Sequence, residues 1–323
     1  MLFLARLRRT SRIPGSTIRD LLEILVIRAL RPPALVAVAS LCHTDSVVTE
    51  DGFPTTLPCT ASHEGADVQH FPIGARVMAA IPRNACGKCR SCQGPNDVHQ
   101  YCQNLQGFLG IDIDGAFAEY LLCDARTSTT IPDNVSFMDA APLACAGVTI
   151  YRAIIVSKVQ KDGWIAIVGA GGGLGHLGIK FAKALGLNGV AVEARDEGLE
   201  VCKEAGADYV LDARKGKNEL VEAIRAFIPQ GPGVDATVNV SNADTAAALA
   251  YALTKMHGTM VQVAQPDNVI IPFVELIFRD IHVIGSLIAG SEVSQDMLNL
   301  VALHGIQVQK NVFHGLPEVP KMI

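Results

Sequence analysis

Apolar residues recur in two alternating patterns along the second half of the chain. Short apolar runs, of which residues 164–168 are the first, alternate with segments whose apolar residues repeat at helical spacing, of which residues 174–185 are the first. The further strands expected are 190–192, 209–211, 234–240 and 259–263, and the further helices expected are 197–205, 219–227 and 243–253. Strands and helices that alternate over short connections predict an α/β fold, a doubly wound parallel sheet covered by helices on both faces.

The first 150 residues follow a different pattern. Their apolar runs are short (34–39, 77–81 and 117–122), Pro, Gly, Cys and His are frequent, and no long helix is expected after residue 30. This pattern predicts a mostly β domain with long functional loops.

Composition narrows the class of protein. Hydrophobic residues make up 49% of the chain and charged residues 18%, which is enough to bury a large core and is not a disordered composition. The net charge of −5 argues against a nucleic-acid partner, which normally meets a basic face. No apolar run reaches the roughly 18 residues of a membrane-spanning helix, so no membrane partner is expected.

The cysteines and the N-terminus bear on location. Four of the nine cysteines lie within residues 86–102, which indicates metal rather than disulfide chemistry and a reducing, cytoplasmic compartment. Residues 1–19 carry five arginines and no acid. Such a stretch is typical of a mitochondrial transit peptide, and the alternative is a basic tail or a mis-joined segment.

A glycine-rich segment follows the first expected strand and opens the first expected helix. Backbone without side chains can approach a pyrophosphate, and the free N–H groups of a helix N-terminus favour its charge. The strict G-x-G-x-x-G pattern fits only at residues 173–178, too deep in the helix, so the working spacing is expected at Gly169, Gly172 and Gly175. The alternative is a plain glycine-rich turn. The residues expected to bind the dinucleotide here are Gly169, Gly171, Gly172, Gly173, Leu174 and Gly175.

An acid ends the second expected strand. Glu193 lies eighteen residues after Gly175, where a carboxylate can accept both adenosine ribose hydroxyls and repel a 2′-phosphate. Arg195 lies two residues further on and could instead pair with that phosphate. The position of Glu193 favours NAD as the cofactor.

Four cysteines in one loop predict a structural zinc site. Tetrahedral zinc accepts four thiolates, and short spacings let one loop wrap around the ion. A zinc ribbon that binds nucleic acid is the other interpretation, but only Lys88 and Arg90 provide positive charge within the cluster. The ligands expected are Cys86, Cys89, Cys92 and Cys102.

Three further segments each offer a ligand in an expected tight turn. Cys42, His63 and Cys145 together make a Cys2His set, which leaves one position on zinc open, as catalytic zinc sites do. Spacing alone does not link these residues, and each alone is equally a buried thiol or a satisfied histidine.

The order and combination of these motifs resemble the zinc-dependent medium-chain alcohol dehydrogenases, especially the yeast type. The resemblance runs from about residue 33 to the end of the chain. It is carried by the cysteine loop, the glycine segment and the segments at residues 42–45, 63–65, 114–120 and 141–149.

This resemblance implies a GroES-like catalytic domain beside a Rossmann domain, with two zinc ions and NAD. It implies a catalytic zinc on Cys42, His63 and Cys145, with Glu64 behind the metal. Further roles it implies are that Asp45 orients His63, His43 contacts the pyrophosphate, Thr44 accepts the substrate proton, and Thr149 packs near the nicotinamide. The metal would lower the pKa of an alcohol, whose carbon then gives a hydride to NAD.

The resemblance also implies partners. A small alcohol or aldehyde is the expected substrate. Members of the family form dimers and tetramers through the edge strand of the Rossmann sheet, so residues 281–289 are the expected interface of a homo-oligomer.

Several segments depart from the family pattern. Val47 stands where many members carry the histidine that ends the proton relay, and the segment between Gly65 and residue 73 is short by about one strand. The segment before residue 33 does not resemble the family's opening strands. The alternative function is therefore a non-catalytic protein of this ancestry that binds a dinucleotide and zinc.

The expected domains follow from these boundaries. Residues 1–32 form an atypical N-terminal segment, 33–154 the GroES-like domain with its zinc loop at 84–104, 155–288 the Rossmann domain, and 289–323 a truncated return to the catalytic domain.

Overall fold

The computed structural model of the chain describes residues 22–26, 34–35, 37–41, 71, 74–94, 98–118, 120–121, 123–228, 231–314 and 317–318. Its contacts divide the chain into two compact units. The first contains residues 1–144 and 309–323, and the second contains residues 145–308. The predicted domain boundaries were drawn from family motifs rather than from contacts, and they stay predictions.

The second unit is built on a six-stranded sheet whose strands all run parallel. In sheet order these strands are β11 (Tyr209–Asp212), β10 (Asn188–Glu193), β9 (Trp164–Val168), β12 (Val234–Asn239), β13 (Thr254–Gln262) and β14 (His282–Gly285). The order reverses direction between β9 and β12. Ligands of doubly wound sheets bind at the carboxyl ends of strands at such a reversal, so the topology places a site directly after β9.

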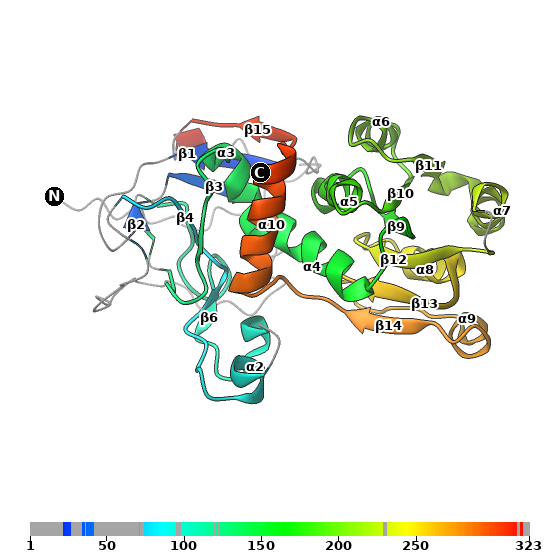
Figure 1. Cartoon of the computed structure of the whole chain (residues 1–323), viewed down its shortest axis with the longest axis horizontal. Coiled ribbons are helices and arrows are strands. Elements are labelled where there is room, and N and C mark those ends of the chain that lie inside the picture. Colours follow the sequence, from blue (N-terminus) through cyan, green and yellow to red (C-terminus); the bar gives the residue numbers. More distant parts are fainter. Residues whose placement is uncertain are drawn as a thin grey trace, which may run out of the picture. The chain divides into compact units, whose positions relative to one another are not determined.

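Helices cover both faces of this sheet (Figure 1). Contacts between neighbouring helices group α4 (Val148–Ser157), α5 (Gly173–Ala184), α6 (Asp196–Glu204) and α10 (Ser291–His304) on one face. The other face carries α7 (Lys217–Phe227), α8 (Ala246–Leu253) and α9 (Phe273–Phe278). A short 3₁₀ turn, η3 (Ala213–Lys215), precedes α7. The predicted α/β fold is confirmed.

The strands of the sheet interior are apolar because both faces are covered. Ile165, Ala166 and Ile167 of β9 and Val190 of β10 are fully buried, and the apolar stripe of α5 packs over them with Leu177. The continuous apolar runs that predicted these strands are therefore the centre of the core.

The start of β13 differs most from the strand that the sequence predicted. The β13 strand starts at Thr254 instead of residue 259, because Val234 pairs with Thr254 before an irregularity that shifts the register to Ala236 and Thr259. His257, at φ 59°, lies in that irregularity. The polar residues there interrupt the apolar pattern, which hid the beginning of the strand.

The first unit contains small sheets. A three-stranded sheet has the order β15 (Lys310–Val312), β1 (Leu22–Val26), β3 (Val38–Leu41), with β15 parallel and β3 antiparallel to β1. The two-stranded sheets pair β2 (Ala34–Leu35) with β7 (Tyr120–Leu121), β4 (Val77–Met78) with β8 (Thr129–Thr130), and β5 (Pro82–Arg83) with β6 (Gly107–Phe108). Two short helical turns, α2 (Arg90–Gln93) and η1 (His99–Tyr101), lie between them in sequence.

A long helical run contradicts the expectation of no long helix within the first 150 residues. It comprises α3 (Phe137–Pro142), the π-helical turn η2 (Leu143–Gly147) and α4. Pro142 and Gly147 disguised it, since both are unfavourable inside helices. In the part of the chain that the structure describes, this run of Phe137–Ser157 alone has the length and composition to cross a membrane. Its most apolar window is 67% buried, and buried core helices share that composition.

Candidate dinucleotide and zinc sites

The glycine segment forms the turn between β9 and α5. The Gly172 residue is the N-cap of α5, and Gly169 has φ +90°, a left-handed conformation that favours glycine. A Cβ atom on Gly175 would lie 2.5 Å from the Cα of Ala170. The turn therefore requires glycine at 169 for its conformation and at 175 for space, which confirms that the helix is opened by a tight, glycine-dependent turn. The free amides at this end of α5 suit a phosphate.

The Glu193 carboxylate lies at the end of β10, beside this turn. Its Oε2 accepts a hydrogen bond of 2.8 Å from the Gly171 amide, and its Oε1 accepts from the amides of Ala194 (2.8 Å) and Arg195 (3.1 Å). Burial raises the pKa of Glu193, but the hydrogen bonds from Arg195, Ala194 and Gly171 outweigh burial and hold it below its ordinary value. The group is therefore a fixed negative charge next to the glycine turn.

Arg195 folds back onto this carboxylate. Its Nε lies 3.3 Å from Oε1 and its Nη2 lies 3.4 Å from Oε2 of Glu193. The arginine side chain is 46% exposed, whereas that of Glu193 is 6% exposed. The sequence suggested Glu193 as a ribose contact and Arg195 as an alternative contact for a 2′-phosphate. In the structure these two side chains bind each other.

Cys145 lies in the π-helical turn η2, not in the tight turn that the sequence predicted. The hydroxyl of Thr149 donates to the Cys145 carbonyl at 2.7 Å, and Thr149 is buried in the first turn of α4. π-helical turns inside helices are frequent at functional sites.

The other predicted residues of the catalytic site lie outside the described residues. These are Cys42, His43, Thr44, Asp45, His63 and Glu64. Val47 and the Arg-rich segment 1–19 lie outside them as well. The convergence of Cys42 and His63 with Cys145 therefore stays a prediction.

The four predicted cysteines of the zinc loop lie together. The Sγ atoms of Cys86, Cys89, Cys92 and Cys102 are all within 4.8 Å of one another, with 3.5 Å between Cys89 and Cys92 and 3.8 Å between Cys89 and Cys102. Sulfur atoms about 2.3 Å from one tetrahedral ion are about 3.8 Å apart. The cluster thus has the dimensions of a tetrahedral zinc site.

Local backbone geometry brings these sulfurs together. Gly87, at φ 66°, turns the chain after Cys86, and Cys89 is the N-cap of the short helix that carries Cys92. The amide of Lys88 donates to the Cys86 sulfur at 3.4 Å, and the amide of Cys86 donates to the Cys102 sulfur at 3.3 Å.

The charges of the thiols explain why the cluster suits a cation. Hydrogen bonds from the backbone amides of Lys88 and Cys89 lower the pKa of Cys86 to about 6. Burial, together with the neighbouring Cys89 and Cys102, raises the pKa of Cys92 to about 12. The four thiols therefore cannot all ionise by themselves, and a divalent cation would compensate the charge of four thiolates.

A carboxylate that sequence analysis missed anchors the base of this loop. Asp124 accepts hydrogen bonds from the amide of Asn84 (3.0 Å) and from Nε (2.9 Å) and Nη2 (2.6 Å) of Arg126. The hydrogen bonds from Arg126 to Asp124 raise the pKa of the Arg126 guanidinium, although burial opposes this shift. No sequence motif marks Asp124, because it lies 22 residues after Cys102 and meets the loop only in the fold.

With this geometry established, similarity to known proteins decides the family. The chain matches the alcohol dehydrogenase GroES-like domain at residues 35–133 and the zinc-binding dehydrogenase domain at residues 173–303. An alcohol dehydrogenase of Geobacillus stearothermophilus is 34% identical over 278 residues, which cover 83% of this chain and 80% of the relative. The chain belongs to the zinc-dependent medium-chain alcohol dehydrogenase family. Zinc and a nicotinamide dinucleotide are accordingly its cofactors.

Other relatives agree with this assignment. An alcohol dehydrogenase of Schizosaccharomyces pombe is 34% identical over 236 residues, which cover 70% of this chain and 66% of the relative. The crystal structure of the alcohol dehydrogenase from Aeropyrum pernix superposes with a TM-score of 0.73 at 26% identity, covering 97% of this chain and 90% of that one. A structure from Sinorhizobium meliloti, described as a zinc-binding dehydrogenase and bound to NADP, gives 0.74 at 26% identity over 95% and 89%. The predicted GroES-like and Rossmann folds are confirmed.

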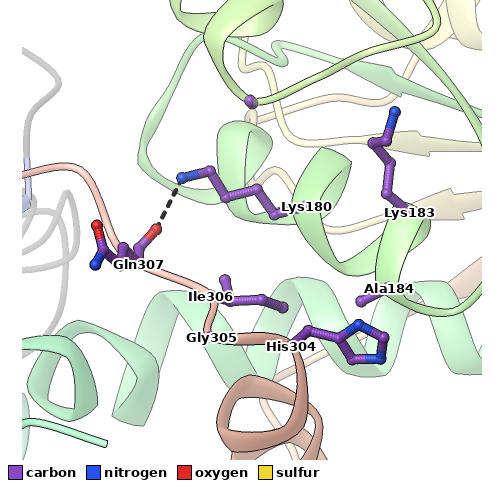
Figure 2. Close-up of a pocket in the computed structure, with 8 residues that line it drawn as sticks. Lys180, Lys183, Ala184, His304, Gly305, Ile306 and Gln307 are labelled. Carbon is purple, nitrogen blue, oxygen red and sulfur yellow. Dashed lines mark hydrogen bonds between the residues drawn. The ribbon is translucent and has the colours of Figure 1, made fainter.

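A hollow of about 440 Å³ lies away from the glycine turn, at the opposite end of α5. Lys180, Lys183 and His304 line it, together with residues that follow α10 (Figure 2). Lys180 donates to the Gln307 carbonyl at 2.8 Å, and Lys183 pairs with Asp208 at 3.5 Å. The first contact ties the segment after α10 to α5, and the second ties α5 to the residue before β11.

Proposed function

We propose that this alcohol dehydrogenase reversibly oxidises a primary or secondary alcohol to an aldehyde or ketone and transfers the hydride to NAD. The observation that carries the proposal is the buried Glu193 carboxylate, held at the end of β10 by the Gly171 amide of the glycine turn. A carboxylate at this position of a doubly wound fold accepts the ribose hydroxyls of NAD.

The choice of NAD over NADP follows from charge. The pKa of Glu193 lies below its ordinary value, so the carboxylate is ionised at neutral pH and repels a 2′-phosphate. Arg195 could attract that phosphate, but its guanidinium is engaged with Glu193. The solved relatives do not decide the question, because one is bound to NADP and an acetophenone reductase of Geotrichum candidum with the same fold is in complex with NAD.

The residues proposed to hold a catalytic zinc are Cys42, His63 and Cys145. When bound, the metal supplies Lewis acidity toward the alcohol oxygen. In the proposed site Thr44 takes the substrate proton, Asp45 orients His63, and Glu64 lies behind the ligand set. Thr149 is proposed to pack near the nicotinamide, where its bond to the Cys145 carbonyl fixes the turn that carries the ligand. His43 is proposed to contact the pyrophosphate.

A second zinc is proposed for Cys86, Cys89, Cys92 and Cys102. Four cysteine ligands leave no position for substrate, so this ion would stabilise the loop instead of taking part in the reaction.

The chain is further proposed to form a homo-oligomer through β14. Among the described strands, β14 is at one end of the sheet, and such an edge can pair with another strand. Its Val283 side chain is exposed, as are the apolar side chains of the preceding helix α9, Phe273, Ile277 and Phe278. We also propose that the substrate is a small alcohol or aldehyde. The proposed location is the cytoplasm, with the mitochondrion as the alternative.

The test is an assay of NADH formation from ethanol or a larger alcohol with NAD, beside a zinc count on the same sample. The proposal expects turnover with NAD, much weaker turnover with NADP, and two zinc ions per chain. Dinucleotide binding with one zinc and no turnover on any primary or secondary alcohol would overturn it. That result would instead support the non-catalytic protein that binds a dinucleotide and zinc.

A further inference from the structure

Gly198 occupies a position where a glycine is unexpected. It is the third residue of α6, and glycine is among the least favourable residues in a helix. Its φ is not in the left-handed region, so conformation does not require a glycine there. The reason for the glycine must therefore be space.

The space next to Gly198 is filled by Glu193. A Cβ atom on Gly198 would lie 2.6 Å from Cγ and 2.7 Å from Cδ of Glu193, which is closer than carbon atoms approach. A Cβ atom on Gly171 would lie 2.8 Å from Oε2 of Glu193 and 2.4 Å from the Cα of Gly198. The glycine turn and the first turn of α6 therefore pack directly against each other, and the carboxylate lies against both.

Glu193 has little freedom to escape an added methyl group. Its side chain is 6% exposed, and its two oxygens accept hydrogen bonds from three backbone amides and from the Arg195 guanidinium. A methyl group on residue 198 would have to move the carboxylate away from the Gly171 amide or push α6 off the turn.

We propose that Gly198 is a positioning residue for cofactor choice. Its missing side chain lets the Glu193 carboxylate lie against the Gly171 amide, where it meets the ribose hydroxyls of NAD and excludes a 2′-phosphate. This inference rests on the proposed use of NAD by the enzyme. Gly198 itself touches neither cofactor nor substrate in this account and acts only through Glu193.

The test uses four variants and direct binding of NADH and NADPH. Binding is followed by quenching of the single tryptophan, Trp164 at the start of β9, so the readout is independent of turnover. The variants are Gly198→Ala, Glu193→Asp, their combination, and Gly189→Ala as the matched control. Gly189 is a buried glycine of β10, where a Cβ atom would meet nothing closer than 3.6 Å.

Gly198→Ala is expected to raise the Kd for NADH about tenfold and to leave the Kd for NADPH within about twofold, so that the preference falls about tenfold. Gly189→Ala is expected to change neither. Since aspartate is one methylene shorter, adding Gly198→Ala to Glu193→Asp should change the Kd for NADH by less than about twofold.

The outcomes separate the inference from the proposed function. A wild-type protein that binds neither dinucleotide overturns both. A wild-type protein that prefers NADH, with Gly198→Ala unchanged or weakened equally for NADH and NADPH, overturns the role of Gly198 alone. The role of Gly198 is also overturned if Gly198→Ala raises the Kd for NADH as much in the Glu193→Asp protein as in the wild type.

If Gly198→Ala alone does not yield a folded protein, the double variant Gly198→Ala/Glu193→Asp decides. If the double variant then folds, the steric clash between the added methyl group and Glu193 is supported. If neither variant folds, the role of Gly198 is overturned.

Discussion

The carbonyl oxygen of Gly169 lies 2.3 Å from the position that a Cβ atom on Gly175 would occupy. Backbone is on both sides of this contact, so no side chain can rotate away to relieve it. We therefore expect Gly175→Ala to lower the free energy of unfolding of the second unit by about 1–3 kcal/mol, the usual cost of an overpacked site. Urea unfolding followed by the fluorescence of Trp164 measures this change.

The distorted turn should also bind the dinucleotide less tightly, because its amides would no longer point at one phosphate site. Gly189→Ala is the control, since a Cβ atom there meets nothing closer than 3.6 Å. Equal stability and equal NADH affinity in the two variants would show that the turn tolerates a side chain at residue 175.

The second prediction concerns the carboxylate at the base of the zinc loop. Asp124→Asn removes the charge that binds Arg126 and the Asn84 amide, and a lost hydrogen bond to a charged group costs about 1.5–3 kcal/mol. We expect structural zinc to pass to a chelator several-fold faster from this variant. Asp133→Asn is the control, because Asp133 is exposed and its described hydrogen bond uses the backbone carbonyl. Identical release from both variants would contradict the anchoring role.

The third prediction is a pH dependence of stability. His176 is buried in the first half of α5, and burial lowers its pKa to about 4 from the ordinary 6.5. The unfolded chain therefore binds a proton between pH 6.5 and 4 that the folded chain does not. The free energy of unfolding is therefore unaffected by this group above pH 6.5. It falls by roughly 3 kcal/mol as the pH drops from 6.5 to about 4.

Other groups titrate in this range, so the comparison is with His176→Asn, which carries no titratable ring. The difference in unfolding free energy between the two proteins should shift in favour of the variant as the pH falls from 6.5 to 4. Parallel curves for the two proteins would show that His176 has the same pKa in the folded and unfolded chains, which contradicts the prediction.

The fourth prediction tests the proposed oligomer. Val283→Lys places a charge on the edge strand β14, where charges oppose strand pairing, and should convert the oligomer to smaller species in sedimentation velocity. Leu303→Lys is the control, because Leu303 is a highly exposed apolar residue of α10. A wild-type monomer, or an oligomer that survives Val283→Lys, would place the interface elsewhere or remove it.

The sequence predicted those features of the structure that are determined by residues close together in the chain. The apolar runs of β9 and β10 and the glycines at residues 169 and 175 report directly on buried strands and a tight turn. The cysteine spacing likewise predicted a cluster, because residues 86–102 form one loop. A π-helical turn around Cys145 was not predictable, since Pro142 and Gly147 argue against a helix.

The residues that sequence missed act through contacts between distant segments. Asp124 supports the zinc loop through Asn84, forty residues earlier, and Gly198 makes room for Glu193 from the next helix. Neither residue belongs to a motif. An unexpected glycine inside the amphipathic pattern of α6 was the one signal available, and it acquires a meaning only once Glu193 is placed beside it.

We propose that Cys145 holds a catalytic zinc in an enzyme that oxidises alcohols with NAD. The most direct measurement is the zinc content, NADH affinity and alcohol oxidation of Cys145→Ser beside the wild type. We expect zinc to fall from two ions per chain to one and oxidation to be lost. The Kd for NADH should stay within about twofold, because the glycine turn is untouched. Two retained zinc ions with full activity would contradict it, and a parallel loss of NADH binding would assign Cys145 to folding instead.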